Sequence, residues 1–452
     1  MPMPTDTAVE LARKMREGRL DPVAVTEAAL EAAAACGDKT IFTGMLASRA
    51  RAEAEAARKR LKAGTPASAL DGVPVVWKDL FDIKGRVTTA GSIVLKGAPP
   101  AAEDALLVAA GARAGLVAIG CTNMTEFAFS GIGLNPHYGT PLNPCSKGPA
   151  RSPGGSSSGS AVAVARGIVP IGMGTDTGGS IRAPAAFNGI TGYKSSTGHY
   201  PMQGVFPLSR TLDTLGPLAR SVEDCIAADA ALRGLGRHAV TAAPVKGMHI
   251  VVPTNVVLDG CEAEVGAAFE ASLARLTTAG ARIERKPLPA LDRIFELIGK
   301  HGHLLGAEAL HLHWDRVHGP DAARMDRRVV TRILSGAKMT AVDLVAVQET
   351  RRQLIAETEA ILGDAVVAFP TVAHVAMEMA PLEADDDVFY RMNAKTLRNT
   401  MVGNFLDWCG VAMPNGIGSA GMPTSLLLSA SHGRDAHVLA AALAVEPLVR
   451  VG

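Results

Sequence analysis

HIVVPTNVVLDGCEAEVGAAFEASLARLTTAGARI, the stretch from residue 249 to residue 283, contains the pattern that decides the fold class. It begins with a short apolar run, which is typical of a buried strand. Apolar residues then recur at helical spacing from Val265 to Leu276, Gly280 ends the helix, and a second strand begins at Ala281. A strand, a helix and a strand in this order predict an α/β architecture in which helices cover a sheet.

Segments of the same kind lie on both sides of this stretch. Short apolar runs predict further buried strands at 72–77, 116–119 and 365–369. Between the first two, a helix is expected at 104–114, with Leu106, Leu107 and Ala110 on its inner face. The alternation of strands and helices therefore continues along most of the chain.

The first 69 residues have a different pattern. Asp21-Pro22 is a good helix start, because aspartate caps a helix N-terminus and proline is favoured at the first helical position. A second helix, mostly charged and rich in alanine, is expected at 49–62. We therefore expect a helical N-terminal region at residues 1–69, packed on a larger α/β/α domain at residues 70–452.

The composition excludes several classes of function. The 452 residues include 45 lysines and arginines and 44 aspartates and glutamates, a balance with no electrostatic footprint for nucleic acid or an anionic membrane. Six scattered cysteines without a CxxC pair favour reduced thiols in a cytoplasmic protein over disulfides or a zinc site. The N-terminus lacks the apolar core of a signal peptide, and no apolar run has the length of a membrane span.

The segment 134–216 is crowded with glycine, serine and proline and contains the candidate chemistry. Its two most unusual stretches are SPGGSSSGSA (152–161) and GTDTGGSIR (174–182). In the second, Ser180 follows two glycines, so that successive N–H groups can converge on an oxyanion. A serine nucleophile needs a base, and Lys78 is the best candidate, because it follows the apolar run GVPVVW and burial disfavours its charged form.

Together these motifs resemble the amidase signature family, serine hydrolases that use a Ser–cis-Ser–Lys triad. GVPVVWKD, SPGGSSSGSA and GTDTGGSIR occur in the family's order, and their key serines stand 24 positions apart, at 156 and 180. The similarity extends through TNMTEFAFS, NPHYGTPLNP, PAAFNGITGYKSS and TLDTLGPLARSVEDC, and returns in NFLDWCGVAMPNG and GMPTSLLL. The resemblance implies a large mixed β-sheet sandwiched by helices, hydrolysis of an amide, and no metal or organic cofactor.

The resemblance also implies roles for individual residues. Ser180 is the expected nucleophile, Ser156 the bridging serine on a cis peptide bond, and Lys78 the base. The expected oxyanion and substrate contacts are the backbone groups of Thr177, Gly178, Gly179 and Ala128. Asp176 and Arg182 are expected to pair and hold the loop. One departure from the family pattern is Ser158, which replaces a glycine and is expected to crowd or hydrate the pocket.

The expected reaction is attack of Ser180 on a small-molecule amide, release of ammonia or an amine, and hydrolysis of the acyl-enzyme. The variable region at 230–395 is expected to form most of the substrate pocket. With only 11 Phe, 4 Tyr and 3 Trp in the chain, a large aryl pocket is disfavoured, and a small aliphatic, carboxylated or urea-like amide is favoured. The family resemblance also suggests a homodimer.

Three alternatives remain from the sequence. Residues 155–159 fit the GxSxG nucleophile elbow, with Ser157 as nucleophile, although that motif needs a strand immediately before it. Glu308 with His311, and Asp315 with His318, have the helical spacing of carboxylate-bridged metal sites, although two further carboxylates would be needed. Similar chains also serve as the glutaminase-type A subunit of a transfer-RNA-dependent amidotransferase, which passes ammonia to a partner.

Overall fold

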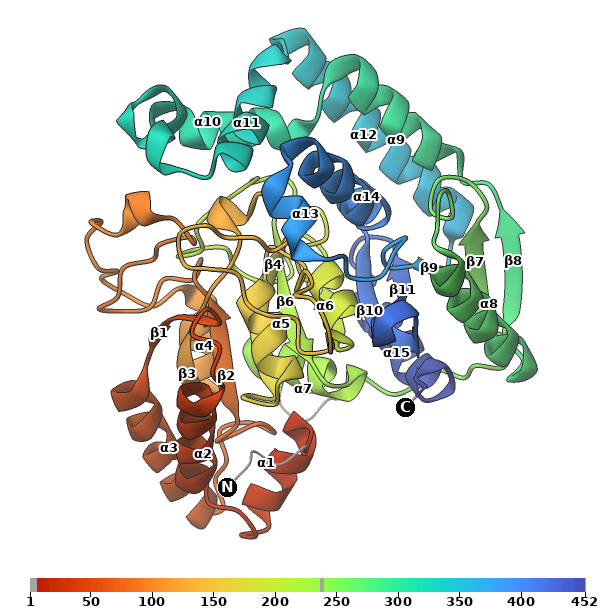
Figure 1. Cartoon of the computed structure of the whole chain (residues 1–452). Coiled ribbons are helices and arrows are strands. Elements are labelled where there is room, and N and C mark those ends of the chain that lie inside the picture. Colours follow the sequence, from red (N-terminus) through yellow and green to blue (C-terminus); the bar gives the residue numbers. More distant parts are fainter. Residues whose placement is uncertain (1–5, 236–239, 452) are drawn as a thin grey trace.

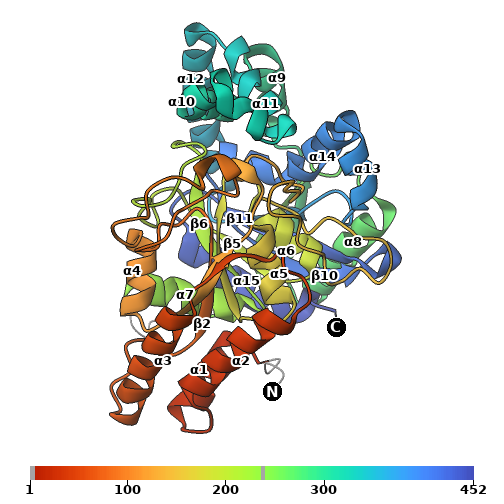
Figure 2. The same cartoon turned by 60° about the vertical axis from the view of Figure 1, so that its left-hand side comes forward.

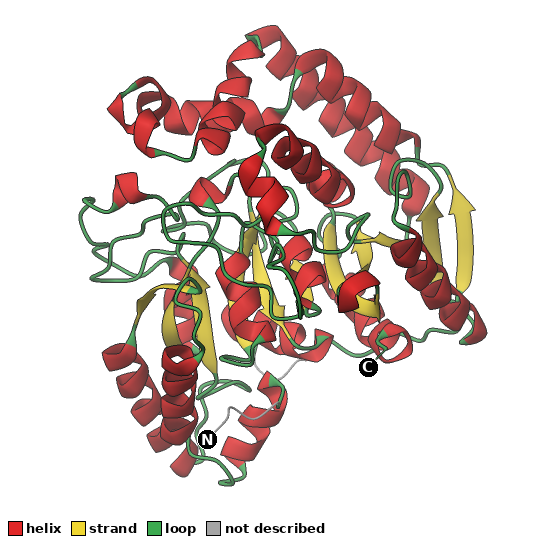
Figure 3. Cartoon of the chain, viewed as in Figure 1, coloured by secondary structure: helices red, strands yellow, loops and turns green. Residues whose placement is uncertain are grey.

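The computed structural model describes residues 6–235 and 240–451. In this part of the chain eleven strands form one mixed sheet, in the order β1-β3-β2-β4-β6-β5-β10-β11-β9-β7-β8 (Figures 1 and 3). The strands are β1 (Phe42–Met45), β2 (Pro74–Lys78), β3 (Val117–Thr122), β4 (Ile171–Asp176), β5 (Thr191–Lys194), β6 (Thr214–Ala219), β7 (His249–Pro253), β8 (Arg282–Lys286), β9 (Val366–Pro370), β10 (Cys409–Ile417) and β11 (Pro423–Ala430).

Helices follow or separate most of the strands. They are α1 (Ala8–Arg16), α2 (Pro22–Ala35), α3 (Ala47–Lys62), α4 (Leu106–Arg113), α5 (Ser158–Ala165), α6 (Arg182–Asn188), α7 (Val222–Arg233), α8 (Ala263–Thr278), α9 (Pro289–His301), α10 (Leu304–His318), α11 (Arg327–Leu334), α12 (Ala341–Leu362), α13 (Met379–Ala384), α14 (Asp386–Phe405) and α15 (Asp435–Val449). None of these described helices combines the length and the apolar character that crossing a membrane requires.

The sheet is buried on both faces, as its apolar runs predict. Successive side chains of a strand point to opposite faces. In β11, Leu426 and Leu428 belong to the core that includes Phe269 of α8, whereas Leu427 belongs to the larger core on the other side. The same alternation separates Val251 of β7 from its two neighbours. The predicted α/β class, with a mixed sheet between helices, is confirmed.

The strand–helix–strand unit at 249–283 is present as β7, α8 and β8, with β7 and β8 parallel. The predicted strands at 72–77, 116–119 and 365–369 are β2, β3 and β9. The prediction for α4 was wrong at one position: Leu107 is buried, but Leu106 is 47% exposed. The buried face of α4 consists of Leu107, Val108 and Gly111, and Leu106 lies outside it.

The N-terminal part holds the helices α1 to α3, with α2 capped by Asp21 as expected. It also contributes β1, which the sequence did not reveal, and which pairs antiparallel with β3 at one edge of the sheet. The four residues of β1 include a glycine and are too few to give an alternation signal. Helices α9 to α12 gather beyond one end of the sheet, at the top of Figures 1 and 2.

Candidate active site

The predicted base lies where two parallel strands end. β2 and β4 are neighbours in the sheet, with Trp77 opposite Met173, so Lys78 at the end of β2 comes beside Thr175 in β4. The Lys78 ammonium donates hydrogen bonds of 2.7 Å to Thr175 Oγ1 and 2.7 Å to Ser156 Oγ. The lysine side chain is wholly buried. Sheet geometry thus brings together residues that are far apart in the sequence.

The environment of Lys78 favours its neutral form. Burial lowers the pKa of Lys78 to about 7, against the opposite influence of the carboxylates of Asp213 and Asp176. A lysine with this pKa is partly neutral at physiological pH and can accept a proton. Its contact with Ser156 gives that proton a direct path.

The two predicted serines lie on adjacent loops. Ser156 follows a cis peptide bond from Gly155, and its hydroxyl meets Lys78. The N–H of the next residue, Ser157, donates to the carbonyl of Ser180 at 3.2 Å. Ser156 is wholly buried and Ser180 is 4% exposed. The structure therefore brings Lys78, Ser156 and the loop of Ser180 into one site.

The loop from Thr177 to Ser180 offers backbone donors. In the part of the chain that the structure describes, the N–H groups of Gly178 and Ser180 have no hydrogen-bond acceptor, so both are available to an oxyanion. The N–H of Gly179 instead donates to Asp176 Oδ1 at 2.8 Å, which removes it from the expected set of donors. Gly179 has a φ of 138°, and a Cβ there would collide with the side chain of Thr400.

Asp176 and Arg182 stabilise this loop. Arg182 Nη2 lies 2.9 Å from Asp176 Oδ1, and Arg182 Nε lies 3.1 Å from Oδ2. Asn404 completes the group, accepting from Arg182 at 2.6 Å and donating to Asp176 at 2.9 Å. Both charged side chains are almost completely buried, and Arg182 holds the pKa of Asp176 well below its usual range although burial alone would raise it. This geometry fits the supporting role expected from the sequence.

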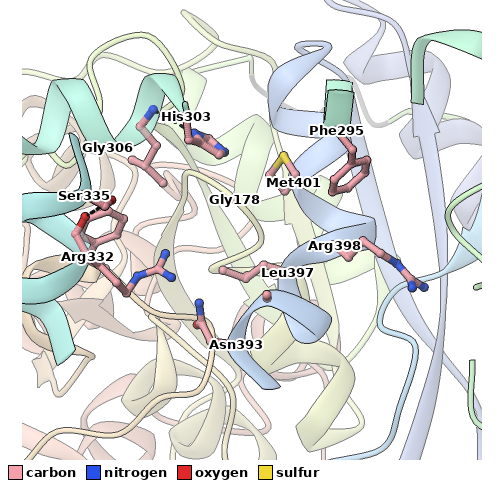
Figure 4. Close-up of a pocket in the computed structure, with 13 residues that line it drawn as sticks. Gly178, Phe295, His303, Gly306, Arg332, Ser335, Asn393, Leu397, Arg398 and Met401 are labelled. Atoms are coloured by element: carbon pink, nitrogen blue, oxygen red, sulfur yellow. Dashed lines mark hydrogen bonds between the residues drawn. The ribbon is translucent and has the colours of Figure 1, made fainter. Parts of the chain in front are cut away.

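A cavity of about 260 Å³ opens on this loop at Gly178 (Figure 4). Its other lining residues come mainly from α9 to α11 and α14, and they are Phe129, Phe295, His303, Leu305, Gly306, Arg332, Ser335, Asn393, Ala394, Leu397, Arg398 and Met401. Ala128, the expected substrate-contacting position, immediately precedes Phe129 and has a φ of 60°. Ser158 is buried at the start of α5 and is not part of the lining.

Arg332 gives the cavity a fixed positive charge. Its guanidinium points into the cavity and stacks on the ring of Phe129, with 4.6 Å between Cζ and the ring centroid (Figure 4). Among the described residues no carboxylate lies within salt-bridge distance of it, and its Nε is buried without a hydrogen-bond partner. Burial lowers the pKa of Arg332 to about 10, which still leaves it charged at pH 7.

Asn393 lies beside this arginine, and the nitrogen of its side-chain amide is available as a hydrogen-bond donor. Its Oδ1 accepts from Ser130 Oγ at 3.0 Å and from the N–H of Gly131 at 2.8 Å. Within the described chain its Nδ2 has no acceptor, so it remains for a ligand. Arg398 differs, because its guanidinium donates to the carbonyls of Asp259 and Val257 and points away from the cavity (Figure 4).

Sequence reasoning missed several of these residues, among them Thr175, Asp213, Arg332 and Asn393. Thr175 and Asp213 lie inside motifs that were recognised, GTDTGGSIR and TLDTLGP, but the hydrogen bond of Thr175 to Lys78 and the electrostatic influence of Asp213 on it depend on the strand pairing. Arg332 and Asn393 both lie in the variable region at 230–395, where no pattern singled them out.

The residues of the two alternative sites have different roles in the structure. No strand precedes Ser157, whose hydroxyl donates to the carbonyl of Thr175 at 3.3 Å, so the nucleophile-elbow geometry is absent from this loop of the described chain. Glu308 accepts hydrogen bonds from Ser209 and Thr211, whereas His311 on the same helix is exposed. The helical spacing of Glu308 and His311 therefore does not form a shared ligand site.

Comparisons with known proteins agree with this geometry. The family model described as Amidase matches residues 24–439. The chain is 35% identical to 2-amino-5-chloromuconic acid deaminase of Comamonas testosteroni, over 89% of this chain and 87% of that protein. It is 32% identical to the A subunit of the glutamyl-tRNA(Gln) amidotransferase of Cupriavidus necator, over 90% of this chain and 89% of that protein. A solved structure described as an amidase matches with a TM-score of 0.87 at 32% identity, over 98% of this chain and 100% of the other.

Proposed function

This chain belongs to the amidase family, and we propose that it hydrolyses the amide of a small, negatively charged molecule through an acyl-enzyme on Ser180. As a family member it is a hydrolase of carbon–nitrogen bonds other than peptide bonds. The observation that carries the proposed mechanism is the 2.7 Å hydrogen bond between the buried Lys78 and Ser156. It lies beneath a loop whose Gly178 lines the cavity.

The proposed reaction begins with attack of Ser180 Oγ on the amide carbonyl carbon. The Ser180 proton moves to Ser156, whose own proton moves to neutral Lys78. The N–H groups of Gly178 and Ser180, together with that of Thr177, stabilise the oxyanion. When the C–N bond breaks, Lys78 returns its proton through Ser156 to the leaving nitrogen. Water then attacks the acyl-enzyme by the same proton route and frees Ser180.

The position of Arg332 in the cavity supports the proposal that the substrate carries a carboxylate. Arg332 is half-buried, its Nε has no hydrogen-bond partner, and no carboxylate of the described residues pairs with it, so a carboxylate in the cavity would give it a charge-assisted hydrogen bond. Asn393 Nδ2 is a second donor for the same group. The relative from Comamonas testosteroni is also named for an acid. The cavity lining, which includes Phe295, His303 and Arg332, supports the proposal that residues 230–395 form the substrate-pocket region.

Release of ammonia from a panel of small amides tests the proposal. The panel pairs each carboxylated amide with an uncharged amide of the same length, and Ser180→Ala is the control protein. We expect release by the native protein and none by the variant. Activity of Ser180→Ala at the native level would refute the nucleophile assignment.

The substrate class is tested by Arg332→Met. Loss of a charge-assisted hydrogen bond costs about 1.5–3 kcal/mol, so kcat/KM for carboxylated amides should fall about 10- to 100-fold, with little change for uncharged ones. Arg398→Met is the matched control, because Arg398 borders the same cavity but donates to backbone carbonyls. An equal loss for both kinds of amide would contradict a carboxylate subsite.

A role as the glutaminase-type A subunit of an amidotransferase is the second candidate, supported by the 32% identity to the Cupriavidus necator protein. In that role the chain would release ammonia from glutamine only when its partner subunits are present. The isolated chain should therefore be tested on glutamine with and without proteins that co-purify with it. Full activity of the isolated chain on another amide favours a stand-alone amidase.

We also propose a cytoplasmic location and a homodimer. The six cysteines are all unpaired, which fits a reducing compartment. The homodimer follows from the family resemblance alone. Light scattering of the purified protein at several concentrations measures the mass of the assembly directly.

A further inference from the structure

Glu308 reaches from the helical wall of the cavity to the core of the protein. It lies on α10, the helix whose Leu305 and Gly306 line the cavity. Its carboxylate accepts hydrogen bonds from the hydroxyls of Ser209 and Thr211, and from the N–H of Thr211 at 3.2 Å. A side chain on the helix that lines the cavity thus holds the 208–213 loop with three hydrogen bonds.

That loop is bonded in turn to the predicted oxyanion loop. Asp213 Oδ2 accepts from the N–H of Leu208 at 2.9 Å and of Ser209 at 3.0 Å, and so closes the loop on itself. Its other oxygen accepts from the hydroxyl of Thr177 at 2.6 Å. Thr177 is 2% exposed and Asp213 is 8% exposed, so water does not compete well for these bonds. Thr177 directly precedes Gly178, whose N–H is one of the proposed oxyanion donors.

A second contact fixes the position of α10. His313, about one and a half turns beyond Glu308, packs on Phe127 with 4.4 Å between ring centroids, and on Phe206 at 5.9 Å. Phe127 precedes the predicted substrate-contacting Ala128. Helix α10 is therefore held both against Phe127 and against the loop that is hydrogen-bonded to Thr177.

We propose that Glu308 is a positioning residue for the hydrolysis, which acts through the 208–213 loop, Asp213 and Thr177 to aim the oxyanion donors. The inference rests on the proposed function, because it presupposes that Ser180 forms the acyl-enzyme. Glu308 does not touch the reacting atoms. Its effect arises because the N–H groups of Gly178 and Ser180 stabilise the oxyanion only while the backbone that carries them is correctly placed.

The test compares Glu308→Ala, Glu308→Gln and the control Asp315→Ala, which removes an exposed carboxylate from the same helix. A misplacement of about 1 Å costs up to about 100-fold in rate, so kcat of Glu308→Ala should fall about tenfold or more, with KM changed less than about threefold. Glu308→Gln should recover most of the rate, because its amide oxygen still accepts. Asp315→Ala should keep the native kcat.

Two further measurements separate positioning from a loss of stability. The rate at which a fluorophosphonate labels Ser180 should fall in Glu308→Ala in parallel with kcat, whereas binding of the amide in the Ser180→Ala background should not change. Thr177→Val interrupts the same path, so adding Glu308→Ala to it should cause little further loss. Additive effects of the two substitutions would overturn the proposed path.

If Glu308→Ala does not fold, the double variant Ser209→Ala with Thr211→Val removes the same hydroxyl donors from the core side. A folded protein of either kind with a native kcat would refute the role of Glu308. If the native protein is labelled at Ser180 and releases ammonia in that experiment, the proposed function stands and only this inference fails. A native protein that is neither labelled nor active would instead refute the proposed function.

Discussion

The pH dependence of hydrolysis is the most direct test of the proposed base. Burial lowers the pKa of Lys78 from its ordinary value of 10.5 to about 7. A change of this size corresponds to about 5 kcal/mol of preference for the neutral amine. At pH 7 about half of the molecules then hold neutral Lys78, whereas an unshifted lysine would be neutral in about one molecule in 3,000.

The direction of the pH dependence follows from which protonation state of Lys78 is active. Neutral Lys78 accepts the proton, so kcat/KM should rise with pH and level off above the pKa. Between pH 6 and pH 8 the neutral fraction grows about tenfold, from about 9% to about 91%, and kcat/KM should grow by the same factor. The measurement is ammonia release at low substrate concentration from pH 5.5 to 9.5, with circular dichroism to verify folding at each pH.

A substitution at Asp213 provides a second, independent test, because it should shift the pKa of Lys78. The Asp213 carboxylate favours the charged form of Lys78, so Asp213→Asn should lower the pKa of Lys78 further and move the rise to lower pH. The Asp213 carboxyl itself has its pKa raised to about 6 by burial, so its effect on Lys78 is largest above that pH. In Lys78→Ala the loss of activity should be much greater at neutral than at high pH. A flat native profile between pH 6 and pH 8, or an equal loss in Lys78→Ala at every pH, would refute the assignment of the base.

Three other substitutions test the loops around Ser180. Ser157→Ala should keep most of the activity, since it removes two long hydrogen bonds to the Thr175 backbone, of 3.3 and 3.4 Å and worth about 1 kcal/mol each, and an inactive but folded variant would revive Ser157 as nucleophile. Gly179→Ala should lose most of the activity in the ammonia assay, because a Cβ at this positive φ meets Thr400; native activity would show that the loop tolerates a shift. Arg182→Ala leaves Asp176 buried without its cation, so the free energy of unfolding in urea should fall by about 3–5 kcal/mol, and an unchanged midpoint would contradict the pairing.

The sequence predicted the parts of the sheet that have simple patterns. The apolar runs of β2, β3, β7 and β9 were recognised, and these strands are buried on both faces. β4 and β10 were not recognised as strands, because their glycines and a proline interrupt any apolar run. These strands are stabilised by neighbours distant in the sequence, and such pairings leave little local signal.

The site was predictable where residues share a motif and unpredictable where the fold alone joins them. Lys78 was proposed as the base because an apolar run precedes it, and the structure indeed buries it beside Ser156. The use of the Gly179 N–H by Asp176 depends on the loop conformation, which composition does not specify. The cavity lining extends from Phe129 to Met401, and no sequence window includes more than a part of it.

Lys78 and Arg332 respond differently to burial. Burial lowers the pKa of both groups, to about 7 for Lys78 and to about 10 for Arg332. Lys78 can therefore exchange a proton near neutral pH, whereas Arg332 keeps its charge throughout that range. A lysine at position 332 with a pKa lowered to the same extent as that of Lys78 would carry its charge in only about half of the molecules at pH 7. A site that needs one exchangeable proton and one permanent charge in the same low-dielectric region therefore requires a lysine for the first and an arginine for the second.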